Sequence, residues 1–206
     1  MILANRISKN YGVVQALKEI SFEVPNGSSC CLLGRSGCGK STALKIAALI
    51  AQPDSGTISI DGVVVNSDHG PNTLQSGRPI GYSFQEPLLL PFLSALENTI
   101  LPDSTPDSER VAKDLLSRLG LSERISHAPS KLSVGEKKRV DIARALLSKP
   151  KVLIADEPFS SLDPDSRAQV SSLFDEFLQG GGTLLYSAVD RSHSTWAKAV
   201  LDLGYS

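Results

Sequence analysis

The chain has 206 residues, with 21 Lys and Arg against 22 Asp and Glu and a formal net charge of −1. This length suits one domain, alone or with a subdomain, and a hydrophobic share of 41% is enough to build a sizeable core. A near-neutral chain is a poor general nucleic-acid binder, because phosphate backbones select an excess of basic side chains. We therefore expect no nucleic-acid partner.

No stretch of the sequence is typical of a membrane-spanning or secretory segment. Apolar windows stay short of the roughly 18 residues that a spanning helix needs, and the best of them, 88–101, contains Pro91, Glu97 and Asn98. Residues 1–12 lack the apolar core of a signal peptide. The three cysteines lack metal-ligand spacing, so we expect reduced thiols in a cytoplasmic protein.

The first 85 residues combine short β-rich runs with one helix. Residues 21–24 and 29–33 are predicted strands, and the second is a continuous apolar run typical of a buried parallel strand. A helix is expected from Ser41 to about Ala51. The dipeptide Asp61-Gly62 between apolar runs predicts a tight hairpin, and 80–84 is a further predicted strand.

A glycine-rich turn joins the strand at 29–33 to the following helix. It fits the pattern G-x-x-x-x-G-K-[ST], whose glycines let backbone N–H groups surround phosphate oxygens. Lys40 is predicted to reach the β- and γ-phosphates, and Ser41 to place its hydroxyl on Mg²⁺. The predicted nucleotide contacts of this loop are Gly34, Arg35, Ser36, Gly37, Cys38, Gly39, Lys40, Ser41 and Thr42.

The pattern from residue 86 to 150 is helical, and α/β alternation returns after it. Residues 108–119 and 135–147 each place apolar side chains on one helical face. The elements expected afterwards are a strand at 152–155, a helix at 165–179, and strands at 183–187 and 199–203. The chain is therefore predicted to be an α/β core interrupted by a helical insert.

Asp156 and Glu157 directly follow the apolar run at 152–155. A buried parallel strand delivers its last residues to the ligand-binding edge of the sheet. Asp156 is predicted to hold Mg²⁺ through water, and Glu157 to polarise the attacking water. Taken alone, these two carboxylates could simply be the solvated end of a strand. The presence of a phosphate loop in the same chain favours the catalytic interpretation.

Residues 132–146 decide the class of nucleotide-binding protein. The run Leu132-Ser133-Val134-Gly135-Glu136 precedes a helix that begins with basic residues and ends Ala-Arg-Ala-Leu. This resembles the signature of ABC-type ATPases, which usually reads Leu-Ser-Gly-Gly-Gln. Ser133 and Glu136 also have the spacing of a helix capping box, and both interpretations are compatible. The guanine-reading motif Asn-Lys-x-Asp is absent from the sequence, which disfavours a GTPase.

Three further positions match this family in order along the chain. Tyr11 stands where the family places an aromatic residue that stacks on adenine. Gln85 matches the glutamine that contacts Mg²⁺ and water and couples to the membrane partner, and Asp163 matches a loop that crosses to the second subunit. A buried tyrosine at a strand end is the alternative for Tyr11.

The resemblance implies one ABC ATPase domain over 1–206 with an α/β P-loop NTPase fold. A RecA-like core with an antiparallel β subdomain would occupy 1–85 and 151–206, and an α-helical subdomain would occupy 86–150. It also implies an ATP- and Mg²⁺-dependent ATPase at the cytoplasmic face of the membrane. The catalytic residues would be Glu157, Gln85 and Lys40, and the metal contacts would be Ser41, Gln85 and Asp156.

The same resemblance implies partners. Transmembrane permease subunits would dock near residues 85–100, where the apolar run 88–93 is either a docking surface or helical core. A second ATPase subunit, identical or different, would complete each site, and a substrate-binding protein is a further expected partner. The residues that would contact the partner's ATP are Ser133, Val134, Gly135, Glu136 and Asp163.

Two departures from the family pattern predict a slow or asymmetric ATPase. Val189 stands where the family normally has a histidine, and valine cannot hydrogen-bond a phosphate or a water molecule. His193 lies four residues on, and a replacement role for it is the weaker alternative. Val134 and Glu136 replace a glycine and a glutamine of the signature, and a β-branched residue crowds an approaching phosphate.

Several functions remain open on the sequence. Residues 84–92 resemble importers of small anions such as nitrate, sulfonate or taurine, whereas 95–102 resemble the lipoprotein-release and macrolide-export group. We favour import of a small molecule, by family analogy. A weakly hydrolysing regulatory module is a further alternative because of Val189. An ATP-gated clamp is disfavoured, since it needs a long coiled coil or two such domains.

Overall fold

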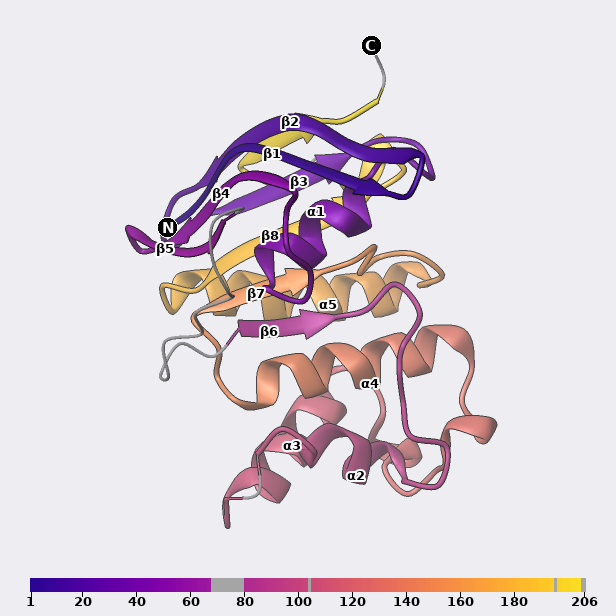
Figure 1. The fold of residues 1–206 in the computed structure, drawn as a ribbon. Helices are drawn as coiled ribbons and strands as arrows, with labels where there is room; N and C mark the ends of the chain where they lie inside the picture. The colour runs from indigo at the N-terminus through magenta and orange to yellow at the C-terminus, as the bar shows by residue number, and fades with distance from the viewer. Residues whose placement is uncertain (68–79, 104, 195, 205–206) are drawn as a thin grey trace.

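The computed structural model describes residues 1–67, 80–103, 105–194 and 196–204, whose strands form two sheets (Figure 1). The antiparallel sheet has the order β2-β1-β4-β5, and the parallel sheet has the order β6-β7-β8-β3-β9. The strands are β1 (Ile2–Tyr11), β2 (Val14–Val24), β3 (Ser29–Leu33), β4 (Ser55–Ile60), β5 (Val63–Ser67), β6 (Ile80–Ser83), β7 (Val152–Ala155), β8 (Thr183–Ala188) and β9 (Ala199–Asp202).

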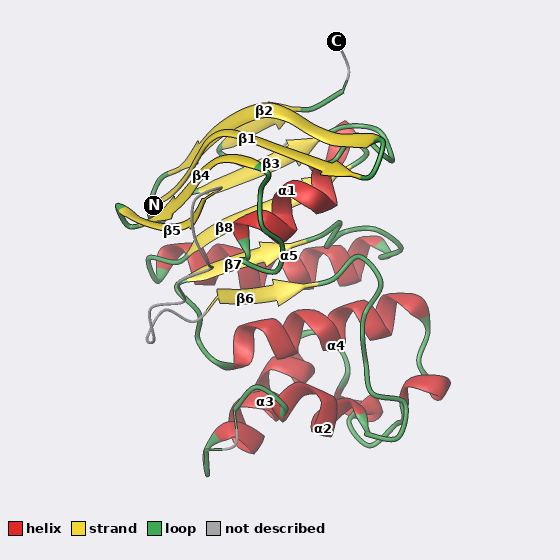
Figure 2. Ribbon diagram, in the orientation of Figure 1, coloured by secondary structure: helices red, strands yellow, loops and turns green. Residues whose placement is uncertain are grey.

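Helices cover both faces of the parallel sheet (Figure 2). Helix α1 lies between the two sheets, α5 lies on the opposite face, and α2, α3 and α4 gather beyond β6. The helices are α1 (Lys40–Ala47), α2 (Ala95–Ile100), α3 (Ser108–Arg118), α4 (Val134–Leu147) and α5 (Pro164–Gln179), with 3₁₀ turns η1 (Ser122–Arg124), η2 (Pro129–Lys131) and η3 (Arg191–His193). The predicted fold class is confirmed, and the domain boundaries at 85/86 and 150/151 stay predictions.

Strand β3 explains why the sheet carries helices on both faces. All its residues are buried, as its continuous apolar run predicts. Successive side chains of a strand point to opposite faces, so Cys30 and Leu32 pack in one core with α1. Cys31 and Leu33 pack in the other core with α5 and the helices beyond β6. Two hydrophobic cores thus enclose β3 from both sides, directly before the phosphate loop.

The N-terminal hairpin of β1 and β2 was predicted only in part. Only 21–24 was expected as a strand, but β1 and β2 pair along most of their length. Their register shifts at several points, and Arg6 and Glu19 adopt left-handed φ angles of 48° and 47°. These irregularities interrupt the regular apolar–polar alternation from which a strand is recognised.

Other elements agree with the predictions apart from their ends. The turn at Asp61-Gly62 is confirmed, with φ angles of 50° and 79° that suit a tight hairpin. Helix α1 ends at Ala47 rather than near Ala51, because Leu49 takes a left-handed φ of 62°. Helix α2 was not predicted, because six residues are too few to show a helical period. No helix of the described residues is long and apolar enough to cross a membrane.

Gly81 places edge strand β6 directly against the backbone of α4. A Cβ atom at this position would lie 2.3 Å from the carbonyl oxygen of Ala145. We expect Gly81→Ala to lower the free energy of unfolding by about 1–3 kcal/mol through overpacking, measured by urea denaturation. Gly180→Ala is the control, since its nearest contact is an ordinary 3.4 Å. Equal stability of the two variants would contradict this packing.

Candidate functional site

A cavity of about 190 Å³ lies where β3, β6 and β7 end and α1 begins. It brings together residues predicted from separate motifs: Ser36, Gly37, Gly39, Lys40, Ser41, Thr42, Gln85 and Glu157. Val14, Gln15 and Ala16 of β2 complete its lining, and the sequence did not single them out. These three residues closely follow Tyr11 in the sequence, and this proximity is the one feature that could have indicated them. The phosphate loop, Gln85 and Glu157 therefore share one space.

The glycines of the phosphate loop are required by its geometry. Gly39 caps α1 with a φ of 98°, and a Cβ atom there would lie 2.2 Å from the carbonyl oxygen of Ala16. Gly37 has a φ of 85°, also in the left-handed region. A Cβ atom on Gly34 would lie 2.5 Å from the sulfur of Cys38. A side chain at Gly39 would therefore displace the turn from β2, and one at Gly34 would displace Cys38, whereas at Gly37 only the backbone conformation favours glycine.

Lys40 points back into its own loop. Its ammonium donates hydrogen bonds to the carbonyl oxygens of Gly34 at 2.8 Å and Arg35 at 3.0 Å. The side chain is buried, whereas Arg35 is exposed. The positive charge is thus held at the edge of the cavity, beside the N-terminus of α1, whose dipole also favours an anion.

Asp156 and Glu157 take different positions although they are adjacent in sequence. Asp156 is 2% exposed, and its Oδ1 accepts a hydrogen bond from the Ser187 hydroxyl at 2.6 Å. The same hydroxyl accepts from the Glu157 N–H at 2.9 Å. Glu157 has a left-handed φ of 48°, a strained conformation of the kind that occurs at functional sites. Glu157 lines the cavity, whereas Asp156 does not.

The donor set at this cavity suits Mg²⁺ together with phosphate. The described residues contain no group of three or more His, Cys, Asp and Glu that could hold a metal on their own. Ser41 and Gln85 present a hydroxyl and an amide at the cavity. Oxygen ligands, including water and substrate phosphates, are those that Mg²⁺ prefers, so a bound nucleotide would supply the remaining ligands.

Tyr11 lies outside this cavity, at the exposed end of β1. Its side chain is 51% exposed, so the alternative of a buried strand-end tyrosine is wrong. The ammonium of Lys9 lies 5.7 Å from the centre of its ring. An exposed aromatic ring beside the strand that lines the cavity is available to stack on a planar group.

Residues 133–136 form the predicted capping box at the start of α4. The Ser133 hydroxyl accepts from the Glu136 N–H at 3.2 Å, and the Ser133 N–H donates to the Glu136 carboxylate at 2.7 Å. This hydrogen bond, with that from Arg124, holds the pKa of Glu136 below its usual range. Val134 is 63% exposed, and a Cβ atom on Gly135 would lie 2.9 Å from the Ser161 carbonyl oxygen.

The signature residues and Asp163 do not line the 190 Å³ cavity. Asp163 caps α5, where its carboxylate accepts from the Ser166 N–H at 2.9 Å and from the Ser166 hydroxyl. These bonds lower the pKa of Asp163. Gly135 packs against the loop that leads to Asp163, so the two segments form one surface apart from the chain's own phosphate loop.

Val189 and His193 lie at a smaller cavity of about 90 Å³ that Glu157 also lines. Val189 follows the last residue of β8, and His193 is the last residue of the 3₁₀ turn η3. The His193 ring packs against Phe159, with ring centres 6.0 Å apart. Burial is the main cause that lowers the pKa of His193. His193 is thus the imidazole that shares a cavity with Glu157.

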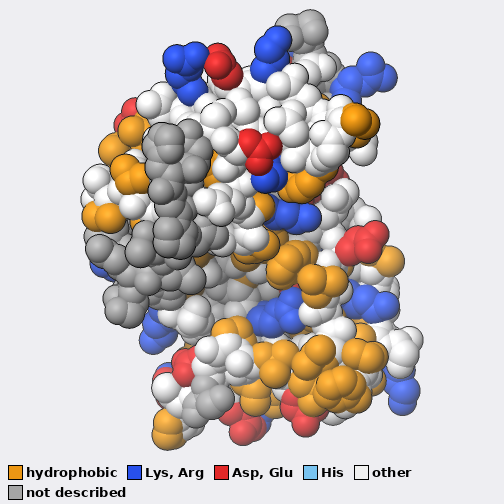
Figure 3. Space-filling view, viewed as in Figure 1, with side chains coloured by type: hydrophobic (Ala, Val, Ile, Leu, Met, Phe, Trp, Pro, Cys, Tyr) orange, Lys and Arg blue, Asp and Glu red, His pale blue; other side chains and the backbone are white. Residues whose placement is uncertain are grey.

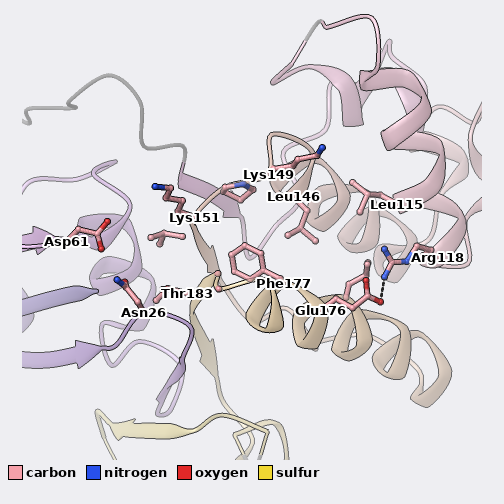
Figure 4. A pocket seen from close by; sticks show the side chains of 16 residues that line it. Asn26, Asp61, Leu115, Arg118, Leu146, Lys149, Lys151, Glu176, Phe177 and Thr183 are labelled. Carbon is pink, nitrogen blue, oxygen red and sulfur yellow. Dashed lines mark hydrogen bonds and ion pairs between the residues drawn. The ribbon is translucent and has the colours of Figure 1, made fainter.

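A larger cavity of about 620 Å³ lies at the amino ends of β7 and β8, opposite the phosphate loop. Figure 4 shows Phe177 near its middle, with Lys149 and Lys151 at the side and Arg118 paired to Glu176. None of the residues predicted for nucleotide binding lines it. The motifs, and not the cavity volume, therefore locate the candidate site.

Comparison with known proteins agrees with this arrangement. The family model described as ABC transporter matches residues 17–160. A lipoprotein-releasing system ATP-binding protein LolD of Bacteroides thetaiotaomicron is 39% identical over 84% of this chain and 83% of its own length. The glutamine transport ATP-binding protein GlnQ of Escherichia coli is 36% identical over 90% of this chain and 79% of its own length.

Solved structures share the whole fold. A dimeric post-hydrolysis state of the ATP-binding cassette MJ0796, bound to ADP and Pi, superposes with a TM-score of 0.88 at 27% identity, covering 99% of this chain and 94% of that one. A second dimeric MJ0796 structure gives a TM-score of 0.87 at 29% identity, covering 99% and 95%. Since the family model, the relatives and the cavity geometry agree, this chain belongs to the ATP-binding, ATP-hydrolysing subunits of ABC transporters.

Proposed function

We propose that the chain binds MgATP at the 190 Å³ cavity and hydrolyses it as half of a dimer that drives a membrane transporter. The observation that carries the proposal is the shared cavity of Lys40, Ser41, Gln85 and Glu157. A phosphate-binding cation, a hydroxyl, an amide and a carboxylate are the groups that phosphoryl transfer to water requires.

Each residue has a distinct role in the proposed reaction. Lys40, the loop N–H groups and the N-terminus of α1 bind the β- and γ-phosphates. Ser41 and Asp156 would hold Mg²⁺, which would supply positive charge beside the phosphate oxygens, and the bond from the γ-phosphorus to the leaving ADP breaks. Gln85 orients the attacking water, and Glu157 accepts the proton of that water as it bonds to the γ-phosphorus. Tyr11 stacks on the adenine ring.

The proposal requires a second subunit because part of the site faces away from the chain's own cavity. Ser133 and its neighbours form the exposed N-terminus of α4, which suits a negatively charged phosphate. Placed head to tail, a partner's signature would close the cavity over the γ-phosphate, with Asp163 crossing beside it. The dimeric form of the solved MJ0796 cassette supports this arrangement.

The proposed contact with transmembrane subunits lies just after Gln85. The apolar run divides there: Leu89 packs against the core, whereas Leu88, Leu90 and Phe92 are 60%, 38% and 77% exposed. Figure 3 shows apolar side chains gathered on the lower part of this face, over the helices. Exposed apolar side chains beside a catalytic loop suit a docking surface, which would hold the chain at the cytoplasmic face of the membrane.

The direction of transport rests on analogy. The relatives include a lipoprotein-releasing protein and a glutamine transport protein, so their names do not point to one class of transported substrate. Import of a small molecule, with a substrate-binding protein as partner, stays our prediction. Export or lipoprotein release is the alternative, and co-purified membrane subunits would identify the class.

Glu157→Gln should separate ATP binding from hydrolysis. The amide keeps the size of the side chain but cannot accept the proton of the attacking water, so we expect turnover to fall by about 100-fold or more. Phosphate release and equilibrium binding of a fluorescent ATP analogue would be measured together. Binding should be unchanged, and Glu123→Gln, on the exposed η1 turn, should behave as wild type. Wild-type turnover by Glu157→Gln would exclude it as the base.

A mixing experiment tests the contribution of Ser133 to the partner's site. Lys40→Met disables the chain's own phosphate loop, and Ser133→Arg blocks the signature surface. Each variant alone should be inactive, whereas a mixture should regain activity, because one site of the mixed dimer keeps an intact loop and an intact signature. If the mixture stays inactive while mixed dimers form, the shared-site arrangement is wrong.

Val189→His tests the reason for the predicted slow turnover. A histidine after β8 would restore a hydrogen-bonding group beside Glu157, so we expect a higher kcat with little change in KM. His193→Ala, measured in parallel, shows whether that imidazole already takes part in hydrolysis. If it does, the kcat of His193→Ala falls below that of wild type. The hypothesis of a slow ATPase is wrong if the wild-type chain turns over ATP rapidly and Val189→His leaves kcat unchanged.

A further inference from the structure

Helix α4 carries two buried charged side chains that the proposed mechanism does not use. Lys138 is 2% exposed and Asp141 is 0% exposed. They lie three residues apart, on one face of the helix, which is turned toward β6 and β7. Charged side chains are seldom buried without specific partners, so the contacts of each are informative.

Lys138 binds backbone carbonyl groups at the ends of two strands. Its ammonium lies 2.5 Å from the carbonyl oxygens of Phe84 and Asp156, and 3.4 Å from that of Gln85. Burial lowers the pKa of Lys138 to about 8, even though nearby carboxylates oppose this shift. One side chain thus joins α4 to the residue before Glu157 and to the loop that contains Gln85.

Asp141 holds the other side of the same peptide segment. Its carboxylate accepts hydrogen bonds from the Phe84 N–H and from the Ser83 hydroxyl, both at 2.8 Å, and pairs with Arg144. Arg144 in turn donates to the Leu88 carbonyl oxygen at 2.7 Å. The N–H and the carbonyl of Phe84 are therefore both bonded to α4, directly before Gln85.

We propose that Lys138 is a positioning residue for ATP hydrolysis, which sets the strand ends bearing Gln85 and Asp156 in register with the helix that presents Ser133. The inference rests on the proposed function of these three residues. Lys138 and Ser133 belong to the same segment, with Ser133 as the cap of α4. A movement of α4 must either carry both strand ends with it or break these hydrogen bonds.

This linkage gives a physical route between the two nucleotide sites of a dimer. The N-terminus of α4 would contact the partner's nucleotide, and Lys138 contacts the backbone beside the chain's own catalytic groups. Because the bonds go to main-chain oxygens, they fix the position of Gln85 and Asp156 without occupying their side chains. A small misplacement of such groups is costly to the rate, though not to nucleotide binding by the phosphate loop.

Lys138→Met tests the proposal, because methionine fills similar space but donates no hydrogen bond. We expect kcat to fall by about tenfold or more, with the affinity for ATP in EDTA unchanged. We also expect Mg²⁺ to improve ATP affinity less in this variant than in wild type. Lys138→Gln, which keeps an amide donor on a shorter side chain, should give intermediate values. Thermal denaturation would show that each variant is folded.

Lys113→Met is the matched control, because Lys113 lies on α3 in an exposed pair with Glu109. Should folded Lys138→Met match this control in kcat and in the Mg²⁺ effect on ATP affinity, the proposal is overturned. If Lys138→Met does not fold, wild-type values in Lys138→Gln overturn it equally. An inactive wild-type chain would instead mean that the proposed function has failed.

Discussion

The functional groups of this molecule depend on a parallel sheet that is buried on both faces. All residues of its middle strands β3, β7 and β8 are buried, so the functional groups stand in the loops that follow the strands. The phosphate loop follows β3, Gln85 follows β6, and Glu157 follows β7. Parallel strands deliver their carboxyl ends to one edge, and that edge is where the 190 Å³ cavity lies.

The signature residues lie apart from this edge. The glycine turn and Glu157 face the cavity, whereas Ser133 and Asp163 cap separate helices outside it. The helix that carries Ser133 is not loosely attached, because Lys138 and Asp141 bond it to the backbone around Phe84. The proposed dimer would therefore join two rigid half-sites, and the buried polar bonds would relate one site to the other.

The sequence predicted the parts of the fold whose signals are local. The phosphate loop, the strand before Asp156 and the capping box at Ser133 follow from residue type and spacing. The hairpin of β1 and β2 was predicted only in part because left-handed residues such as Arg6 break its alternation. Lys138 was missed because its partners are backbone carbonyl groups, which every residue has and which no sequence pattern marks.

The dependence of the specific ATPase rate on chain concentration tests the central claim most directly. If each chain holds half of each site, the Mg²⁺-dependent rate per chain should be near zero in dilute solution and should rise with concentration as dimers form. It should level off once dimers predominate. A rate per chain that stays constant from the lowest measurable concentration, with the protein monomeric throughout, would contradict the account, because one chain would then contain the whole site.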